Sequence, residues 1–508
     1  MQSVLSYYSR SMNSPALDIP LPYGLFAFAC ALGLAATIRL LLSPLRGIPG
    51  PWYANMSDAH LSYYALRFDK SRALHKLFLS YGRVVRIAPR IVMFSSASAL
   101  RAIGSHPKHS MYAVFNMRGV SHTFTFLDSK SHAGRRRVVL GHWLPMNLTS
   151  HEADITHSVS QLTSYLRGSD GQTPLDALVF LRHFMVDVIF SYVLEVRVGA
   201  LEALFENVTH ELSDAVTDFP KEHFLRSVVP TPLWNLLKLI PHERWRRFCR
   251  AEDIMLQVAE ERMRELQTTS NVDTSSLMGR MMSYASEHKG DPLSVQDIAT
   301  ECAVQLIAGA ETTSTTASFG LWELSKRPDI VRRIREELTD HNIELNSMSG
   351  KDLHRLPYLD AFLKEVLRLY APVPTLLMRT VPKGQHHVMI GDVEIPAGVT
   401  VGVQAWTMHR DPDAFINPEE FVPERWLAES DAQNNNFMPF GIPGVRSCIG
   451  KHLGLLSLKT IIAAVVLNFD IAPGTDTTER TMRVKDAFVA LPAGQKAEFY
   501  FRPLVTEF

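Results

Sequence analysis

A long uncharged run lies near the amino terminus. Residues 19–38 contain no charged side chain and are rich in Leu, Ala and Phe. Twenty residues at 1.5 Å each make a helix of roughly 30 Å, which matches the bilayer core. A cleaved signal peptide has a shorter apolar region of about 7–15 residues, so we expect a membrane anchor over 19–42 after a short segment, 1–18. Arg39 and Arg46 after the run, against Arg10 before it, favour a cytosolic body.

The remainder of the chain has a mainly helical pattern, with a small β region. It begins with a Pro-rich hinge, 43–52, where proline prevents continuation of the anchor helix. The body follows over 53–508. Within it, Ser294 and Asp297 are spaced as a capping box, which predicts the start of a long helix. We predict a β-hairpin from residues 84–87 and 91–94, and helices over about 243–267, 295–326, 358–370 and 449–468.

Composition narrows the class of protein. Lys plus Arg and Asp plus Glu both total 52 among 508 residues, so overall charge gives no reason to bind nucleic acid. The four cysteines are scattered and form no CxxC pair, which argues against a disulfide framework and for a reducing compartment. We therefore expect a large globular body that is attached to a membrane and does not bind nucleic acid.

The strongest chemical signal is the segment 440–450, which reads FGIPGVRSCIG. Cys448 stands where a helix begins, and free N–H groups with the positive dipole end should lower the pKa of its thiol. The glycines let the main chain approach a large flat group, and Arg446 could pair with a carboxylate on that group. An iron porphyrin with an axial thiolate meets these demands; the alternative is a buried structural cysteine after a glycine turn.

A second signal lies on the long helix, at residues 308–312, which read AGAET. Gly309 costs about 1 kcal/mol of helix stability relative to Ala, as expected if a ligand presses against the backbone. Thr312 can bond a carbonyl or a small molecule, and Glu311 can pass protons through water. A weak, Thr-rich stretch of helix is the other interpretation.

These motifs resemble those of the membrane-anchored cytochrome P450 monooxygenases of the endoplasmic reticulum. The resemblance runs from the hinge to the carboxyl end and implies that family's single, mainly helical fold with a small β region. Cys448 resembles the proximal ligand of haem b, and Phe440, Gly444, Arg446 and Gly450 resemble the loop that shields it. Phe440 stands eight residues before Cys448, whereas the family usually has seven, so Ile442 or Pro443 is extra.

The resemblance also assigns residues outside this loop. Glu311 and Thr312 resemble the acid and alcohol that deliver protons during oxygen activation. Arg136 and Arg379 resemble partners of the two haem propionates, and His132 stands where the family often has Trp.

A buried ion pair is implied as well. Glu365 and Arg368 lie three residues apart, on one face of a helix, with Arg425 as a third member. The resemblance gives them a structural role on the proximal side.

The segment 111–127 covers the distal pocket in this family. Its aromatic residues are therefore candidate substrate contacts, with core packing as the alternative. They are Tyr112, Phe115, Phe124 and Phe126.

The expected activity is oxidation of an apolar small molecule with O₂ and electrons from NADPH through a separate NADPH-cytochrome reductase. The motifs are similar to those of fungal members that act on secondary metabolites, which leaves terpenoid, polyketide and alkaloid skeletons open. Two alternatives remain at this stage: an isomerase or dehydratase of the same fold without O₂ activation, and a membrane-tethered haem protein without turnover.

Overall fold

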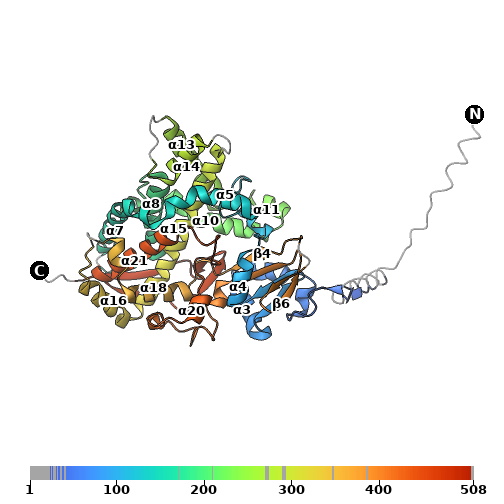
Figure 1. Ribbon diagram of the computed structural model, residues 1–508. Coiled ribbons are helices and arrows are strands. Elements are labelled where there is room, and N and C mark those ends of the chain that lie inside the picture. Colours follow the sequence, from blue (N-terminus) through green and yellow to red (C-terminus); the bar gives the residue numbers. More distant parts are fainter. Residues whose placement is uncertain are drawn as a thin grey trace, which may run out of the picture.

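The computed structural model describes residues 42–504 except 170, 207, 209, 269–273, 289–292, 346–347 and 385–386. Before residue 42 it describes Tyr23, Phe26, Cys30, Gly33, Leu34, Thr37 and Ile38, all helical and exposed. The rest of the predicted anchor lies outside the described residues. The body has a triangular outline and is mostly helical, with β4 and β6 on the right of the view and α7 and α16 on the left (Figure 1).

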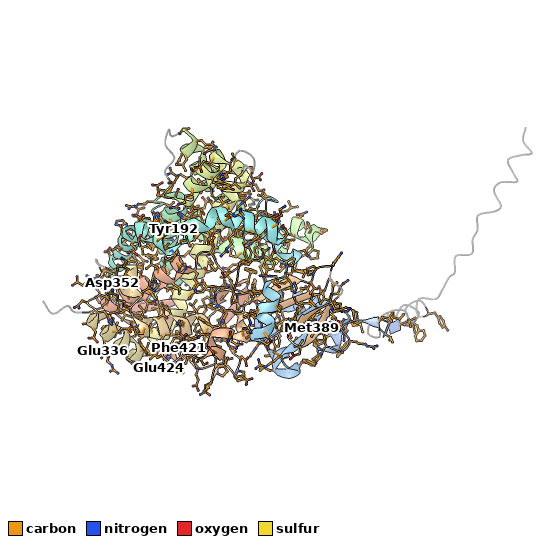
Figure 2. All side chains as sticks on the ribbon, in the orientation of Figure 1. Tyr192, Glu336, Asp352, Met389, Phe421 and Glu424 are labelled. Carbon is orange, nitrogen blue, oxygen red and sulfur yellow. The ribbon has the colours of Figure 1, made fainter. Side chains whose placement is uncertain are left out.

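The centre of the body is α15 (Val295–Ser325), which packs against α8 (Ala177–Leu194), α10, α13 and α21. Ser294 and Asp297 form the predicted capping box at its start. Side chains fill the interior densely, and Tyr192 of α8 is among the largest that are fully buried (Figure 2). The helices are α2 (Ala59–Leu66), α3 (Lys70–Tyr81), α4 (Ala97–Gly104), α5 (Ser129–Leu140), α6 (Pro145–Leu148), α7 (Glu152–Arg167), α9 (Ala200–Phe205), α10 (Glu211–Arg226), α11 (Thr231–Leu237), α12 (Glu243–Cys249), α13 (Ala251–Thr268), α14 (Leu277–Glu287), α16 (Pro328–Asp340), α17 (Gly350–Leu353), α18 (Pro357–Leu369), α19 (Ala405–Met408), α20 (Asp431–Asn436) and α21 (Lys451–Asn468).

The predicted helices agree with this arrangement except in one place. The pattern over 243–267 predicted one helix, whereas the structure has α12 and α13. Arg250 leaves the helical conformation (φ −105°, ψ 4°) and separates the two. Charge alternation continues across this break, which is why the pattern did not reveal it.

The strands form one mixed sheet and three small antiparallel units. The predicted hairpin is confirmed as β1 and β2, which begin the four-stranded sheet β1-β2-β7-β4. Within it, β2 and β7 are parallel and β4 and β7 are antiparallel. The strands are β1 (Val84–Ala88), β2 (Ile91–Phe94), β3 (Leu175–Asp176), β4 (Leu376–Thr380), β5 (His387–Ile390), β6 (Val393–Pro396), β7 (Thr400–Gln404), β8 (Phe469–Pro473), β9 (Val484–Ala487), β10 (Val489–Pro492) and β11 (Glu498–Pro503).

Among the described residues, two helices are long and apolar enough to cross a bilayer, α8 and α21. Their apolar stretches are 83% and 61% buried inside the body. Burial on this scale explains their apolar sequence through core packing.

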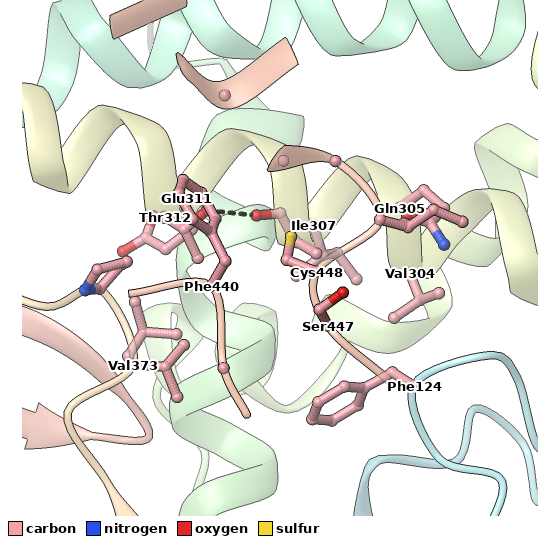
Figure 3. A pocket seen from close by; sticks show the side chains of 18 of the residues that line it. Phe124, Val304, Gln305, Ile307, Glu311, Thr312, Val373, Phe440, Ser447 and Cys448 are labelled. Atoms are coloured by element: carbon pink, nitrogen blue, oxygen red, sulfur yellow. Dashed lines mark hydrogen bonds between the residues drawn. The ribbon is translucent and has the colours of Figure 1, made fainter. Parts of the chain in front are cut away.

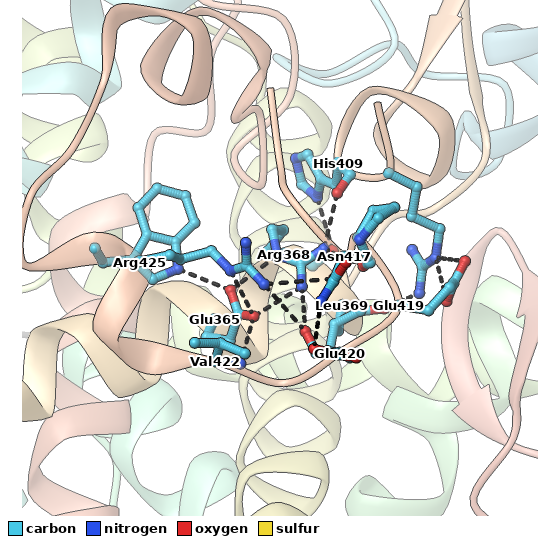
Figure 4. A network of polar contacts seen from close by, with 12 residues as sticks. Glu365, Arg368, Leu369, His409, Asn417, Glu419, Glu420, Val422 and Arg425 are labelled. Carbon is cyan, nitrogen blue, oxygen red and sulfur yellow. Dashed lines mark hydrogen bonds and ion pairs between the residues drawn. The ribbon is translucent and has the colours of Figure 1, made fainter. Parts of the chain in front are cut away.

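A buried ion pair ties α18 to the loop that follows α19 (Figure 4). Glu365 accepts from the Arg368 guanidinium at 2.7 and 2.8 Å, and neither side chain has any exposed area. The same carboxylate accepts from Arg425 Nε at 3.1 Å and from Trp426 Nε1 at 2.8 Å. Glu365, Arg368 and Arg425 thus lie together as predicted, and both arginines donate to the Glu365 carboxylate.

Arg368 extends this network toward the Cys448 segment. Its guanidinium donates to the carbonyls of His409, Pro418 and Glu420 at 2.9, 2.6 and 2.9 Å. The His409 ring bonds the Arg368 carbonyl at 3.0 Å and accepts from the Met438 amide at 2.8 Å. One side chain therefore links the ion pair to the backbone two residues before Phe440.

Removing one member of this pair should destabilise the protein strongly. Glu365→Ala leaves Arg368 as an unpaired buried charge, for which we expect a loss of about 3–5 kcal/mol. Chemical denaturation followed by circular dichroism measures it. Glu243→Ala is the matched control, because Glu243 is mostly exposed and its nearest cation is 3.9 Å away. If both variants lose equally little stability, the Glu365–Arg368 pair does not have this structural role.

Acid should weaken the link through His409. Burial, opposed by a bond to the Arg368 carbonyl, lowers the pKa of His409 to about 3. Below pH about 6.5 the unfolded chain binds a proton there and the folded chain does not, so stability falls as pH decreases from 6.5 toward 3.

His409→Asn should therefore flatten the dependence of unfolding free energy on pH over this window, by at most about 1.4 kcal/mol per pH unit. Denaturant titrations at several pH values measure the slope. The control is His341→Asn, at an exposed site, which should keep the slope of the wild type. If His409→Asn also keeps that slope, His409 does not cause the loss of stability in acid.

Candidate functional site

A cavity of about 310 Å³ lies between α15 and the segment that carries Cys448 (Figure 3). Its wall is mostly apolar, with a few polar side chains at separate places. All ten predicted site residues except Gly444 line it: His132, Arg136, Glu311, Thr312, Arg379, Phe440, Arg446, Cys448 and Gly450. The structure thus brings together residues from four distant parts of the chain.

Cys448 stands three residues before α21, at the end of an irregular loop. Its amide donates to the Phe440 carbonyl at 3.0 Å, which closes the loop on itself. Cys448 is accessible where it lines the cavity, yet it lies deep inside the protein, and burial raises the pKa of its thiol. The expected lowering was wrong in sign, because desolvation outweighs the Gly450 amide and the charge of Arg136.

The raised pKa bears on what can bind here. A thiol in this setting stays protonated unless a cation coordinates it, and coordination deprotonates a thiol outright. No cluster of three or more His, Cys, Asp or Glu side chains suited to a metal occurs within the described part of the chain. An iron bound at Cys448 must therefore bring its other ligands with it, as an iron porphyrin does.

One of the two residues predicted to be extra in the loop, Ile442, is accommodated by packing. Ile442 is only 3% exposed and belongs to the second core cluster, against α4. A Cβ at Gly104 would lie 2.9 Å from Ile442 Cγ2, so a glycine there makes room for it. Gly441 and Gly444 have φ values of +82° and +128°, where side chains are strained. The longer loop still keeps Phe440 on the cavity wall.

Three arginines surround one edge of the cavity. Arg446 donates to the carbonyls of residues 126–128 at 2.7–3.0 Å, and Arg136 donates to the Ser447 carbonyl at 3.0 Å. Arg379 donates to the neighbouring Met378 carbonyl at 3.0 Å, while its buried Nε has no partner. Each predicted propionate partner therefore lies at the cavity, and Arg379 Nε can still donate a hydrogen bond there.

Sequence reasoning missed Lys108 at this edge, and it named Tyr112 only as a candidate substrate contact. Lys108 is 8% exposed and donates to the Phe124 carbonyl; burial, then the charges of Arg379 and Arg446, holds its pKa well below the usual value. The Tyr112 hydroxyl is buried without a partner. Buried cations that repel one another fit the two carboxylates of a haem. The sequence offered no signal for Lys108, because it stands in a polar run, SHPKHS, at 105–110.

His132 also lines this edge. Burial, followed by the charges of Arg446 and Lys108, lowers the pKa of His132 to about 4. At neutral pH it is therefore an uncharged ring that can donate one hydrogen bond without adding to the positive charge.

On the opposite wall, Glu311 is held by two residues that the sequence did not reveal. It accepts from Thr217 Oγ1 of α10 at 2.7 Å and from Arg182 Nε of α8 at 3.3 Å, and it is 2% exposed. Thr312 donates its hydroxyl to the Ala308 carbonyl at 2.7 Å. The acid and the alcohol are adjacent but engaged by different partners.

Gly309 has a different role from the one expected. A Cβ there would lie 2.7 Å from Ile189 Cδ1 of α8, so the close approach is made by that side chain. Gly309 lines the cavity as well, but its lack of a side chain is explained by helix packing.

The aromatic residues of segment 111–127 divide into two groups. Tyr112, Phe115 and Phe124 line the cavity, whereas the Phe126 ring lies 5.5 Å from the Arg135 guanidinium instead. Phe488, which the sequence did not suggest, joins the first group, 4.7 Å from the Phe115 ring. These four rings therefore form part of the cavity wall.

Solved structures share the fold of this chain. Retinoic-acid-bound cyanobacterial CYP120A1 is 20% identical with a TM-score of 0.70, covering 90% of this chain and 99% of that one. The P450DA heme domain is 19% identical with a TM-score of 0.75, covering 90% and 98%. Both likenesses concern the fold.

Curated relatives come from fungi. The monooxygenase lcsK of Purpureocillium lilacinum is 27% identical, covering 89% of this chain and 82% of the relative. Tryprostatin B 6-hydroxylase of Neosartorya fischeri is 28% identical, covering 85% and 78%. The monooxygenase stcB of Emericella nidulans is 26% identical, covering 91% and 89%. The model of the Cytochrome P450 family matches residues 61–499, so the chain belongs to the cytochrome P450 family of monooxygenases.

Proposed function

We propose that this protein uses O₂ and electrons from NADPH, passed by a separate NADPH-cytochrome reductase, to hydroxylate or otherwise oxidise an apolar small molecule. The observation that supports it best is the position of Cys448 on one side of an apolar cavity with Glu311 and Thr312 on the other. When bound, haem b supplies the iron at which oxygen is activated, and thiolate ligation favours O–O cleavage.

In this proposal the protein would hold the cofactor at two places. Cys448 would ligate the iron, within the loop that Phe440, Gly444 and Gly450 shape. Arg136, Arg379, Arg446 and His132, joined by Lys108, would bind the propionates. Burial, and after it the repulsion from Arg379, lowers the pKa of Lys108 and of Arg446. Two carboxylates would offset that repulsion.

Proton supply is assigned to Glu311 and Thr312. Because the Thr312 hydrogen is directed to the Ala308 carbonyl, its oxygen is free to accept a hydrogen bond from a molecule in the cavity. Glu311 lies one residue away, and release from Thr217 would let its carboxylate take up and pass on protons.

We propose further that residues 19–42 anchor the protein in the endoplasmic reticulum membrane, with the body facing the cytosol. The uncharged run and the exposure of its described residues, such as Phe26 at 70%, support this. Relatives named for tryprostatin B hydroxylation, and the fungal origin of the others, support a step in secondary-metabolite biosynthesis.

Changing the sulfur ligand tests the core of the proposal. Cys448→Ser should abolish the absorption band that thiolate-ligated haem gives when reduced and bound to carbon monoxide, because serine is a poor ligand for the iron. Cys249→Ser is the matched control and should keep the band. Retention of the band in Cys448→Ser would exclude Cys448 as the ligand.

Changing the alcohol tests proton supply. Thr312→Ala should raise severalfold the share of NADPH that ends as hydrogen peroxide instead of product, because the hydroxyl no longer orders protons at the cavity. Peroxide and product are measured with the purified protein, a reductase and a turned-over compound.

Ser318→Ala is the control for that variant. Ser318 makes the same kind of bond on α15, to the Ser314 carbonyl at 2.9 Å, and does not line the cavity. If both variants keep the coupling of the wild type, Thr312 has no part in proton supply.

A further inference from the structure

One polar side chain of the cavity wall has no part in the assignments above. Gln305 lies on α15, seven residues before Thr312, and lines the cavity with 8% of its surface exposed. Figure 3 shows it beside Val304, on the other side of Cys448 from Glu311 and Thr312. A buried amide in an apolar wall carries a desolvation cost, so its two ends need partners.

The orientation of this amide is fixed by Glu301. Gln305 Nε2 donates to Glu301 Oε1 at 3.0 Å, and Glu301 has no exposed area. The other carboxylate oxygen accepts from the Thr123 amide at 2.9 Å and contacts Arg135 at 3.5 Å. An ionised carboxylate only accepts hydrogen bonds, so the NH₂ group of Gln305 must face it.

The amide oxygen of Gln305 is left at the cavity. It accepts no hydrogen bond from any residue that the structure describes, whereas the NH₂ end is bonded. Because Glu301 also holds the backbone at Thr123 and is paired with Arg135, the amide cannot turn without leaving a buried donor unsatisfied. The cavity therefore presents a fixed acceptor that a ligand with an O–H or N–H group would satisfy.

Aromatic rings lie on the cavity wall that also presents this acceptor. The ring centroids of Phe124 and Phe115 are 5.8 Å apart, and that of Phe488 lies 4.7 Å from that of Phe115. The Lys108 ammonium already lies over the Phe124 ring, 4.1 Å from its centroid, while Val304 lines the wall next to Gln305. Rings of this kind accept other aromatic rings edge to face or offset, and the desolvation cost in a mostly apolar cavity disfavours a charged ligand.

We infer that the substrate is a neutral aromatic molecule that carries a hydroxyl or N–H group, which donates to Gln305 Oε1. Gln305 is then a specificity-determining residue of the distal pocket. This inference rests on the proposed function, since it assumes that the substrate binds on this side of the haem.

Three probes of similar shape test it on the full-length haem protein: phenanthrene, a phenanthrenol and the methyl ether of that phenanthrenol. Binding is measured from the change in the haem absorption spectrum. The phenol should bind about tenfold more tightly than phenanthrene, as one buried hydrogen bond predicts. The ether accepts but does not donate, so it should show no such gain.

Gln305→Met keeps the length of the side chain and removes the acceptor, and it should abolish the preference for the phenol. Val304→Ala is the matched control, since it removes apolar volume beside Gln305 and should affect the phenol and phenanthrene alike. If Gln305→Met does not fold, the three probes on the wild type still decide the matter.

Two results would overturn the inference: a wild type that binds ether and phenol equally, or a Gln305→Met protein that keeps the preference. Either result with a normal thiolate-haem spectrum leaves the proposed function intact. Loss of that spectrum in the wild type would contradict the proposed function itself.

Discussion

The structure depends on one buried charge, the guanidinium of Arg368. A charge without exposed area is tolerable only when every donor has an acceptor, and here Glu365 and three backbone carbonyls provide them. These carbonyls belong to a loop with little regular structure, which the ion pair therefore holds in one conformation. Because His409 carries the same network to Met438, the position of the Cys448 segment follows from it.

Local signals were enough to predict the main helices and the candidate ligand. Ser294 with Asp297 marks the start of α15, because capping acts within a few residues. The separation of α12 from α13 was missed because a change of backbone angle at Arg250 leaves the charge pattern unaltered.

Partners that come from distant elements could not be predicted. Arg182 and Thr217 lie 129 and 94 residues from Glu311 and meet it only through the packing of α8 and α10 on α15. Burial also made one prediction wrong. The helix start at Cys448 suggested that the pKa of its thiol is lowered, whereas desolvation raises this pKa. Position 309 likewise has no room for a side chain because Ile189 of a neighbouring helix packs against it, and no pattern within α15 could show this contact.

The loop before Cys448 depends on a residue that lies far from it in the sequence. Ile442, one of the two residues predicted to be extra, packs against α4, where Gly104 leaves room for it, and the amide of Cys448 still reaches the Phe440 carbonyl. Any side chain at position 104 would press on Ile442 and, through it, on the loop that holds Cys448. A helix outside the motif therefore limits which sequences the motif can contain.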